Sequence, residues 1–314
     1  MQAILDKLSK ATINTKNKGQ GKAFGRIFEI IFRISLITTI TSLGLIVLYI
    51  LFSGFKLFGS VSFSNFFLGL NWEPVSQKQF GILPMIITSF YITIASLLVS
   101  APIGIACAVY AAELASGTYK ISVQAAVQIL AGTPSVVFGL IGLAVIAPWV
   151  QGLAQVPGLS ILAAVIILSI MILPTIVSIS QDVIQSVPKE MKEASLSLGA
   201  THFQTIMKVI VPIARPGITT AIVLALSRAF GEAMAVKMVI GNIQTMPNFS
   251  SEYWFGLLSP ARTLTTNIIG DIEYAREGSH LQALFATGAV LFIVIMLVNY
   301  IAYLFKKFSV GVKA

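Results

Sequence analysis

Long apolar stretches, nearly free of charged residues, alternate with polar loops along this chain. A helix that crosses a bilayer needs about 20 apolar residues, and the longest stretches meet that length. One of them, from residue 121 to residue 182, holds two such lengths separated by a turn that contains Gly and Pro. The pattern predicts six membrane-spanning helices, at residues 30–53, 82–112, 121–149, 159–181, 214–240 and 282–305. The expected fold is an all-α integral membrane protein.

The remaining segments divide the chain around these helices. Residues 1–29 form a predicted N-terminal tail, and residues 30–81 hold the first helix and an outer loop. Residues 82–305 form the main transmembrane domain, which contains a loop at 188–212, and residues 306–314 form a C-terminal tail. In the outer loop, four aromatic residues are typical of side chains that lie along a membrane surface: Phe63, Phe66, Phe67 and Trp72.

Several predicted helices contain proline inside the apolar stretch, namely Pro102, Pro134 and Pro174. Proline removes a backbone hydrogen bond and bends or breaks a helix, which a membrane tolerates where neighbouring groups satisfy the freed carbonyl. Two interpretations remain open: ordinary kinks within a bundle, or broken helices that line a polar pathway.

Charged residues make up only 11% of the chain. A soluble domain carries roughly 25%, so this chain has too few charges to cover a water-exposed surface. The positions of Lys and Arg predict the orientation, because cytoplasmic loops of membrane proteins carry an excess of these residues. With the N-terminus inside, 15 of the 21 Lys and Arg lie on the cytoplasmic side and four lie outside. We therefore expect both termini in the cytoplasm and no nucleic-acid partner.

The loop at 188–212 has the pattern of two short helices joined by a glycine bend. Pro188 suits the first position of a helix, and Glu193 follows in its early turns, where acidic residues are favourable. Gly199 ends this helix. A second amphipathic stretch then runs until it stops at Pro212, and the loop is predicted to lie on the cytoplasmic face.

The spacing of these residues resembles the signature of the permease subunits of binding-protein-dependent ABC importers. The Glu-Ala-Ala element of that signature corresponds to Glu193, Ala194 and Ser195, where Ser replaces the second Ala. Its glycine corresponds to Gly199, and its closing proline to Pro212. The resemblance implies a type I ABC importer permease fold, in which the short helix docks into a groove of a separate ATP-binding subunit. Since the chain contains no G-x-x-x-x-G-K-[ST] sequence, ATP is expected to bind to that partner, and no cofactor is expected in this chain.

The fifth predicted helix carries ionisable residues inside an apolar span. Arg228 and Glu232 are four residues apart, so a continuous helix places them on nearly the same face. Arg228 lies roughly 24 Å from Pro212 along such a helix, near the bilayer midplane. Charges at that depth cost at least ~2.5 kcal/mol each, so they normally face a cavity or a partner and mark function. The two alternatives are an ion pair that satisfies itself and a site for a ligand.

Small residues recur at every fourth position of the same helix, a spacing that lets another helix approach closely. This ridge comprises Gly217, Ala221, Ala225, Ala229 and Ala233. Lys237 lies about 13 Å beyond Arg228 and is expected to extend its ammonium group to the outer membrane surface.

The chemistry of the two charged residues suits an oxyanion. Arg228 offers a planar set of donors, and the Glu232 carboxylate accepts a hydrogen bond from an anion that still carries a proton. Phosphate near pH 7 keeps a proton, whereas sulfate does not. One cation beside one anion leaves little net attraction, which suits a site that the ligand must leave again. Arg228 and Glu232, with the neighbouring Ser227, are therefore the predicted residues of a substrate pathway.

Several stretches are similar to the phosphate-specific ABC permeases of the PstC type: residues 131–140, 226–242, 264–269 and 277–284. The resemblance implies three kinds of protein partner: a second permease of the PstA type, two ATP-binding subunits and an extracytoplasmic phosphate-binding protein. It also implies the bacterial inner membrane as the location, and the apolar spans make membrane lipid a further partner. The chain is thus expected to be the permease subunit of an ATP-driven phosphate importer and not itself an enzyme. The alternatives are a permease for molybdate or sulfate, an ion-coupled carrier that needs no ATPase, and a membrane scaffold without a transport role.

The remaining polar residues give weaker signals. His202 and His280 have no His, Cys or acidic cluster at metal-ligand spacing, so no metal site is expected. Asp271, Glu273 and Glu277 form an acidic outer patch, interpreted as a solvated face or as a contact for the binding protein.

Overall fold

The structure, a computed structural model, describes residues 17–154, 158–275 and 278–311 of the chain. Residues 1–16 and 312–314 of the predicted tails lie outside the described residues. The same holds for Glu277 of the predicted acidic patch.

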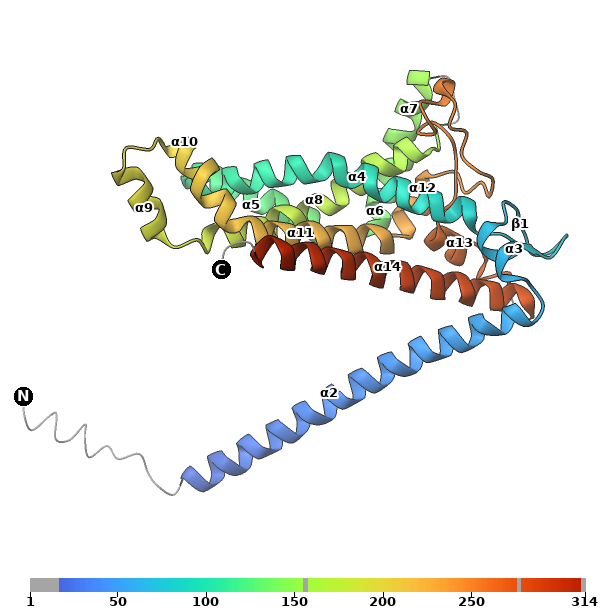
Figure 1. Ribbon diagram of the computed structural model, residues 1–314, viewed down its shortest axis with the longest axis horizontal. Helices are drawn as coiled ribbons and strands as arrows, with labels where there is room; N and C mark the ends of the chain where they lie inside the picture. Colours follow the sequence, from blue (N-terminus) through green and yellow to red (C-terminus); the bar gives the residue numbers. More distant parts are fainter. Residues whose placement is uncertain (1–16, 155–157, 276–277, 312–314) are drawn as a thin grey trace, which may run out of the picture. The chain divides into compact units, whose positions relative to one another are not determined.

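The chain divides into two compact units, residues 1–52 and residues 53–314. The described part of the first unit is one helix, α2 (Asn17–Phe55), whose last turn belongs to the second unit (Figure 1). Its apolar part from Phe28 onward confirms the first predicted span, although the helix itself starts earlier than predicted.

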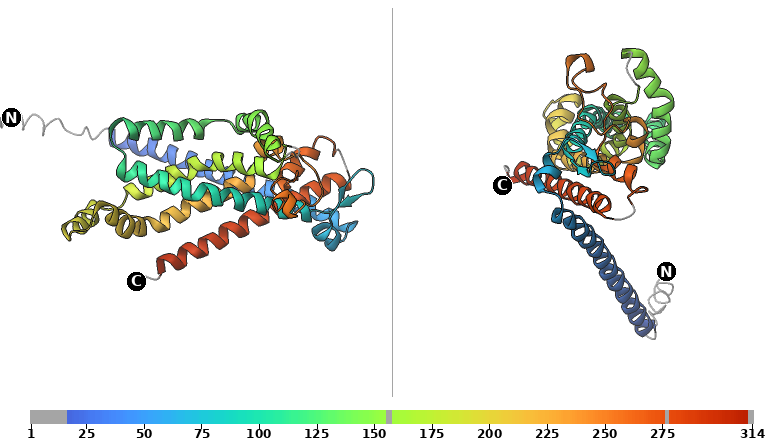
Figure 2. Two further views of the ribbon diagram at one scale, coloured as in Figure 1. Left: turned by 90° about the horizontal axis from the view of Figure 1, so that it is seen from above. Right: turned by 90° about the vertical axis from the view of Figure 1, so that its right-hand side faces the viewer.

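Three long helices form the centre of the second unit: α4 (Leu83–Val109), α8 (Ile161–Gln185) and α11 (Val211–Gly231). They lie side by side in Figure 1 and in the two further views of Figure 2. About two thirds of the most apolar part of α8 is buried inside the chain, a larger share than in any other described span. Ile172 of α8 belongs to the same core as Ile92 of α4 and Ala225 of α11. The helix α8 is therefore the central helix of the bundle.

Further helices surround this centre: α5 (Gly117–Gly132), α6 (Ser135–Ile141), α7 (Ala147–Ala154), α12 (Met234–Val239) and α14 (Ser279–Gly311). Helix α5 packs against α8, α12 packs against α6 and α8, and α14 packs against α11. A wide π-helical turn ends α4 at Tyr110–Leu114. Similar turns join helices end to end at Gly142–Ile146 and Ile206–Ile210.

The two ends of the bundle are different (Figure 1). At one end, here named the α9 end, lie α9 (Lys189–Ser197) and α10 (His202–Thr205). The opposite end, here named the hairpin end, holds α3 (Phe63–Leu68), α13 (Leu264–Asp271), β1 (Trp72–Glu73), β2 (Gln79–Phe80) and the 3₁₀ helices Lys56–Gly59 and Ser251–Tyr253. The two strands are antiparallel, and Trp72 pairs with Phe80.

Among the residues that the structure describes, six helices are long and apolar enough to cross a membrane, which confirms the predicted number. Two of the predicted spans, however, are not continuous helices. The third breaks at Thr133 and Pro134, because a residue before proline avoids helical backbone angles and proline donates no hydrogen bond. The fifth breaks at Glu232 and Ala233, between α11 and α12. The prolines inside α4 and α8, by contrast, lie within continuous helices.

The prediction that the aromatic residues of the outer loop lie along the membrane surface is wrong for two of them. Phe66 and Trp72 have only 0% and 1% of their surface exposed. They belong to a second core at the hairpin end, which α4 and α14 complete, and those covering residues lie too far away in the sequence for a local pattern to reveal them. Phe63 is about half exposed and stacks on Phe58 with ring centroids 3.8 Å apart.

Two glycines at the hairpin end bring main-chain segments into direct contact. A Cβ on Gly81 would lie 2.3 Å from the carbonyl carbon of Gly69, and main-chain atoms cannot move aside as a flexible side chain does. We expect Gly81→Ala to lower the free energy of unfolding by roughly 1–3 kcal/mol, measured by thermal unfolding of the purified protein in detergent. Gly59→Ala is the control, because a Cβ at Gly59 meets nothing within 4 Å. Equal stability of the two variants would contradict the close approach.

Candidate functional site

The loop at 188–212 forms the α9 end of the bundle. A turn at Gly199 joins α9 to α10, and its φ of +82° lies in the left-handed region that favours glycine. A Cβ at Gly199 would meet nothing within 4 Å, so the backbone angle rather than crowding explains this residue. Thr201 begins α10 with a capping box, in which the Thr201 hydroxyl accepts from the Gln204 N–H and the Gln204 side chain accepts from the Thr201 N–H.

The predicted coupling residues of α9 lie on two sides of that helix. Glu193 and Ala194 are exposed. Ser195 is half-buried, and its hydroxyl oxygen lies 3.0 Å from the hydroxyl oxygen of Thr205. This hydrogen bond holds α9 against α10, while Glu193 and Ala194 stay accessible to another protein.

Large apolar side chains are also exposed at this end, namely Met191, Leu196, Leu198, Phe203 and Met207. Leu198 is 89% exposed and Phe203 is 71% exposed. Figure 1 shows that α9 and α10 extend beyond the ends of α4 and α8. An exposed apolar patch on a polar loop is typical of a protein–protein contact.

An ion pair connects α9 to the central bundle. Lys192 Nζ lies 2.5 Å from Glu113 Oε2, and Glu113 belongs to the π-helical turn that follows α4. The Glu113 side chain is only 10% exposed, so water screens this pair less than it screens a surface pair. Helix α9 is thus fixed to α4 as well as to α10.

The prediction that the second helix of the loop stops at Pro212 is wrong. The helix continues from His202 through the π-helical turn into α11, and Pro212 lies in the first turn of α11. Proline cannot donate to the carbonyl one turn earlier, and its ring would clash with that carbonyl in a regular α-helix. The wider π turn just before Pro212 relieves this conflict without ending the helix.

Glu232 does not lie on the helix that carries Arg228, which corrects the prediction of two side chains on one helical face. Glu232 has an extended backbone conformation, with φ −72° and ψ 127°. Its carboxylate Oε1 accepts a hydrogen bond of 3.2 Å from the N–H of Ala235, in the first turn of α12. A small cavity beside it is lined by Glu232 and, among others, by hydroxyl residues of α4 and of the chain around α13: Ser89, Thr93, Thr263 and Thr265.

Arg228 and Ser227 point to different neighbours of α11. Arg228 is exposed, and its Nη1 donates to the Thr175 hydroxyl of α8 at 3.1 Å. The Ser227 hydroxyl donates to the Asn299 side chain of α14 at 2.5 Å. The side chains of Ser227 and Arg228 therefore contact different helices. Among the described residues, the structure gives no Arg228–Glu232 ion pair.

The small-residue ridge of α11 faces the chain's own bundle. Ala221, Ala225 and Ala229 are buried. A Cβ on Gly217 would lie 2.3 Å from Val183 of α8, so the helix that approaches this ridge is α8. Ala233 lies beyond the end of α11, which corrects its predicted place on the ridge.

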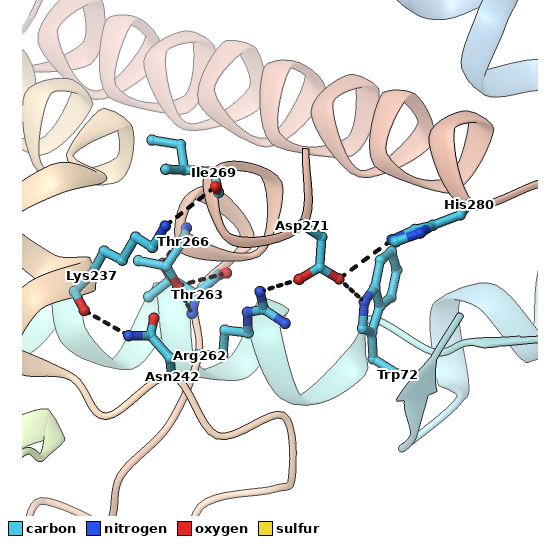
Figure 3. A network of polar contacts seen from close by, with 9 residues as sticks. All are labelled: Trp72, Lys237, Asn242, Arg262, Thr263, Thr266, Ile269, Asp271 and His280. Atoms are coloured by element: carbon cyan, nitrogen blue, oxygen red, sulfur yellow. Dashed lines mark hydrogen bonds and ion pairs between the residues drawn. The ribbon is translucent and has the colours of Figure 1, made fainter. Parts of the chain in front are cut away.

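The Lys237 ammonium group has a partner within the chain. Its Nζ donates to the carbonyl oxygen of Ile269 at 3.3 Å, as Figure 3 shows. Ile269 lies near the C-terminal end of α13, where carbonyls lack a helical partner. A cation at that position satisfies one of those carbonyls and favourably meets the negative end of the helix dipole.

A buried charge network occupies the hairpin end (Figure 3). Arg262 Nη2 lies 2.5 Å from Asp271 Oδ1, and the Trp72 Nε1 donates to Asp271 Oδ2 at 2.7 Å. His280 Nε2 lies 3.4 Å from the same carboxylate. Asp271 is therefore not part of a solvated acidic patch, as its sequence neighbours indicated. No local signal reveals this network, because Trp72 and Asp271 are 199 positions apart in the chain.

In the part of the chain that the structure describes, no group of three or more His, Cys, Asp or Glu residues could hold a metal ion. His202 is exposed in α10. His280, in the first turn of α14, faces Asp271.

Comparison with known proteins identifies the class. Residues 100–309 match the family model described as binding-protein-dependent transport system inner membrane component. This match covers about two thirds of the chain, and the chain therefore belongs to that family and is a multi-pass inner-membrane protein. Its relatives in the family are permease subunits rather than enzymes.

Among its relatives is the probable ABC transporter permease protein YqgH of Bacillus subtilis strain 168. The two are 44% identical over 253 residues, which cover 78% of this chain and 80% of the relative. The phosphate transport system permease protein PstC of Mesorhizobium japonicum is 32% identical over 296 residues, covering 88% of each chain. PstC of Haemophilus influenzae is 32% identical over 254 residues, covering 74% of this chain and 78% of the relative.

Solved structures confirm the predicted type I ABC importer permease fold. A bacterial alginate ABC transporter, in complex with an alginate pentasaccharide-bound periplasmic protein, gives a TM-score of 0.57 at 17% identity. That likeness covers 92% of this chain and 95% of the alginate transporter chain. The inward-facing MetNI methionine ABC transporter gives 0.55 at 19% identity, covering 73% of this chain and 94% of its own.

The network around Asp271 makes a prediction about pH. Burial alone raises the pKa of Asp271, but the hydrogen bonds from Trp72 and Arg262, together with the charges of Arg262 and His280, outweigh it and hold the pKa below its usual value. The unfolded chain therefore binds the proton more readily than the folded one. The stabilisation is complete above the ordinary aspartate pKa of about 3.9 and is lost as the pH falls through the lower folded pKa.

We expect Asp271→Asn to be less stable than wild type at pH 7 by roughly 3–5 kcal/mol, because Arg262 then keeps a buried charge without its carboxylate. Below pH ~4 the difference should shrink. Thermal unfolding followed by tryptophan fluorescence between pH 7 and pH 3 measures both effects. Glu273→Gln, which removes an exposed carboxylate of the same segment, is the control and should change little. A stability gap that does not depend on pH would contradict this account.

Proposed function

We propose that this chain is a permease subunit of an ATP-driven importer and that inorganic phosphate is its cargo. The two PstC relatives, which cover most of the chain at 32% identity, support this cargo. In the proposed assembly the chain pairs with a second permease of the PstA type, two ATP-binding subunits and an extracytoplasmic phosphate-binding protein. Both termini and the α9 end face the cytoplasm. ATP binds to the partner subunits, and this chain catalyses no covalent step.

The α9 end supports the docking of an ATP-binding subunit. Its apolar patch is exposed at the tip of the bundle, where this chain offers nothing to cover it among the described residues. The Lys192–Glu113 ion pair and the Ser195–Thr205 hydrogen bond connect that patch to α4 and α11. A movement imposed on α9 is thereby carried directly into two membrane helices.

The position of Arg228 carries the proposal of a substrate pathway. Its hydroxyl partner, Thr175, lies about 21 Å from the Ile161 end of α8 and about 15 Å from the Gln185 end, which is near the middle of that helix. A guanidinium that is exposed at this depth is costly in lipid, so it faces a polar space or a partner protein instead. We place a polar pathway between this face of α11 and the second permease.

In this proposal Glu232, at the break between α11 and α12, determines which anion passes. The Glu232 carboxylate lies just beyond the end of α11, four residues after Arg228 in the chain. Arg228 attracts an oxyanion through its planar set of donors. Glu232 accepts a hydrogen bond from an anion that carries a proton, and it repels one that does not. This pairing favours phosphate over sulfate, and transport of molybdate or sulfate is the alternative within the same class.

Uptake in reconstituted vesicles tests the cargo and the pathway. We expect the complete transporter to take up labelled phosphate when ATP is supplied, with sulfate and molybdate competing poorly. Arg228→Gln should lower the uptake rate at least about 10-fold, since it removes a charge-assisted hydrogen bond. The control is Arg215→Gln, an exposed arginine on the same helix towards the α9 end. Competition by sulfate equal to that of phosphate would contradict the role of Glu232, and unchanged uptake by Arg228→Gln would contradict the pathway.

Copurification tests the docking surface and distinguishes this class from an ATP-independent carrier or a scaffold. We expect Leu198→Ser to reduce the amount of ATP-binding subunit that copurifies with the chain, because Leu198 is 89% exposed and supports no fold contact. Leu68→Ser, at the hairpin end and 63% exposed, is the matched control. The proposal fails if no ATP-binding subunit accompanies the wild type, or if both variants lose it equally.

A further inference from the structure

One segment at the hairpin end holds the broken part of the fifth span at three points. The N–H of Ala261 donates to the carbonyl of Ile240, just after α12, at 3.0 Å. Lys237, inside α12, donates to the carbonyl of Ile269. The Thr265 hydroxyl donates to the carbonyl of Glu232, just before α12, at 3.0 Å. The start, the middle and the end of residues 232–240 are therefore all bound to residues 261–271.

The Thr265 bond meets a specific need of the backbone. The helix ends at Gly231, so the Glu232 carbonyl leaves the helical direction and needs a partner outside α11. Thr265 is only 7% exposed, and its hydroxyl has a single proton, which goes to Glu232. Its oxygen also lies 2.9 Å from the Thr263 hydroxyl oxygen, which itself donates to the Thr266 hydroxyl, so Thr265 belongs to a cluster of three threonine hydroxyls.

The same segment is anchored at both of its ends. The N–H of Leu264 donates to the Ser89 hydroxyl of α4 at 3.0 Å, which fixes the turn that contains Thr265. The Arg262–Asp271 ion pair closes the segment on itself, and Trp72 binds the same carboxylate (Figure 3). A hydroxyl held this firmly can define where the Glu232 backbone lies.

We propose that Thr265 is a positioning residue for Glu232. Its hydroxyl fixes the backbone of Glu232 at the break and thereby sets where the carboxylate meets the anion in the pathway. The segment 261–271 thus transmits the arrangement of the hairpin end to the selective group of the transporter. This inference rests on the proposed role of Glu232 in the pathway.

The test uses the complete transporter in vesicles and compares Thr265→Val with Thr265→Ser. Valine keeps the shape but removes the hydroxyl, so we expect the KM for phosphate to rise about 3- to 10-fold and the preference for phosphate over sulfate to fall. Serine keeps the hydroxyl and should restore both. Thr287→Val is the matched control, because Thr287 is also buried and its hydroxyl donates to a carbonyl of its own helix. It should leave KM and selectivity unchanged.

A double variant separates positioning from a general loss of structure. If Thr265 acts through Glu232, then Thr265→Val should add little to the effect of Glu232→Gln on KM and selectivity. Additive effects would overturn the inference, as would equal losses in the Val and Ser variants. Failure of the wild type to take up phosphate would refute the proposed cargo instead. In that case the same double-variant comparison, made with whichever of sulfate or molybdate is transported, still tests Thr265.

Discussion

Inside a bilayer, a backbone N–H or carbonyl that leaves a helix must find another partner, because lipid offers none. The break at Glu232 depends on this constraint. The Glu232 carboxylate accepts the N–H of Ala235, and the Glu232 carbonyl accepts the Thr265 hydroxyl. These substitute bonds allow α11 to end close to Arg228, and they require residues 261–271 to lie directly against α12.

One continuous helical path links the α9 end of the bundle to the break at Glu232. From His202 to Gly231 the chain is helical for 30 residues without a break, a length of about 45 Å. The same rod therefore carries part of the apolar patch of the α9 end and, near its other end, Arg228. In the proposed assembly, a movement at the docking surface would reach the proposed pathway through one helix, and the Lys192–Glu113 ion pair would also pass it to α4. A helix can transmit movement in this way only when it packs against a stable element, which here is the central helix α8.

Much of this architecture could be predicted from the sequence, because the features concerned are local. The six spans follow from length and apolarity, and the turn of the α9 end follows from Gly199. The break at Glu232 could not be predicted. Small residues continue across it at helical spacing, and its stabilising partner, Thr265, lies 33 positions further on. Pro134 did give a local signal, but only the surrounding structure decides between a kink and a break.

The polar interior of the hairpin end was hidden for the same reason. Asp271 has acidic neighbours in the sequence and reads as part of a solvated patch. Its actual partners come from the loop before α4, from the chain before α13 and from the start of α14. Patterns along one segment do not report such contacts, because the groups that neutralise the carboxylate are set by the assembled fold.

The interrupted fifth span also imposes an order on the biogenesis of the protein. When residues up to 240 have entered the membrane, the Glu232 carbonyl still lacks Thr265, since that residue has not yet been inserted beside it. Until then this stretch must either remain an unbroken helix or keep its polar groups in contact with water. The Thr265 bond can therefore form only once residues 261–271 have folded back onto α12.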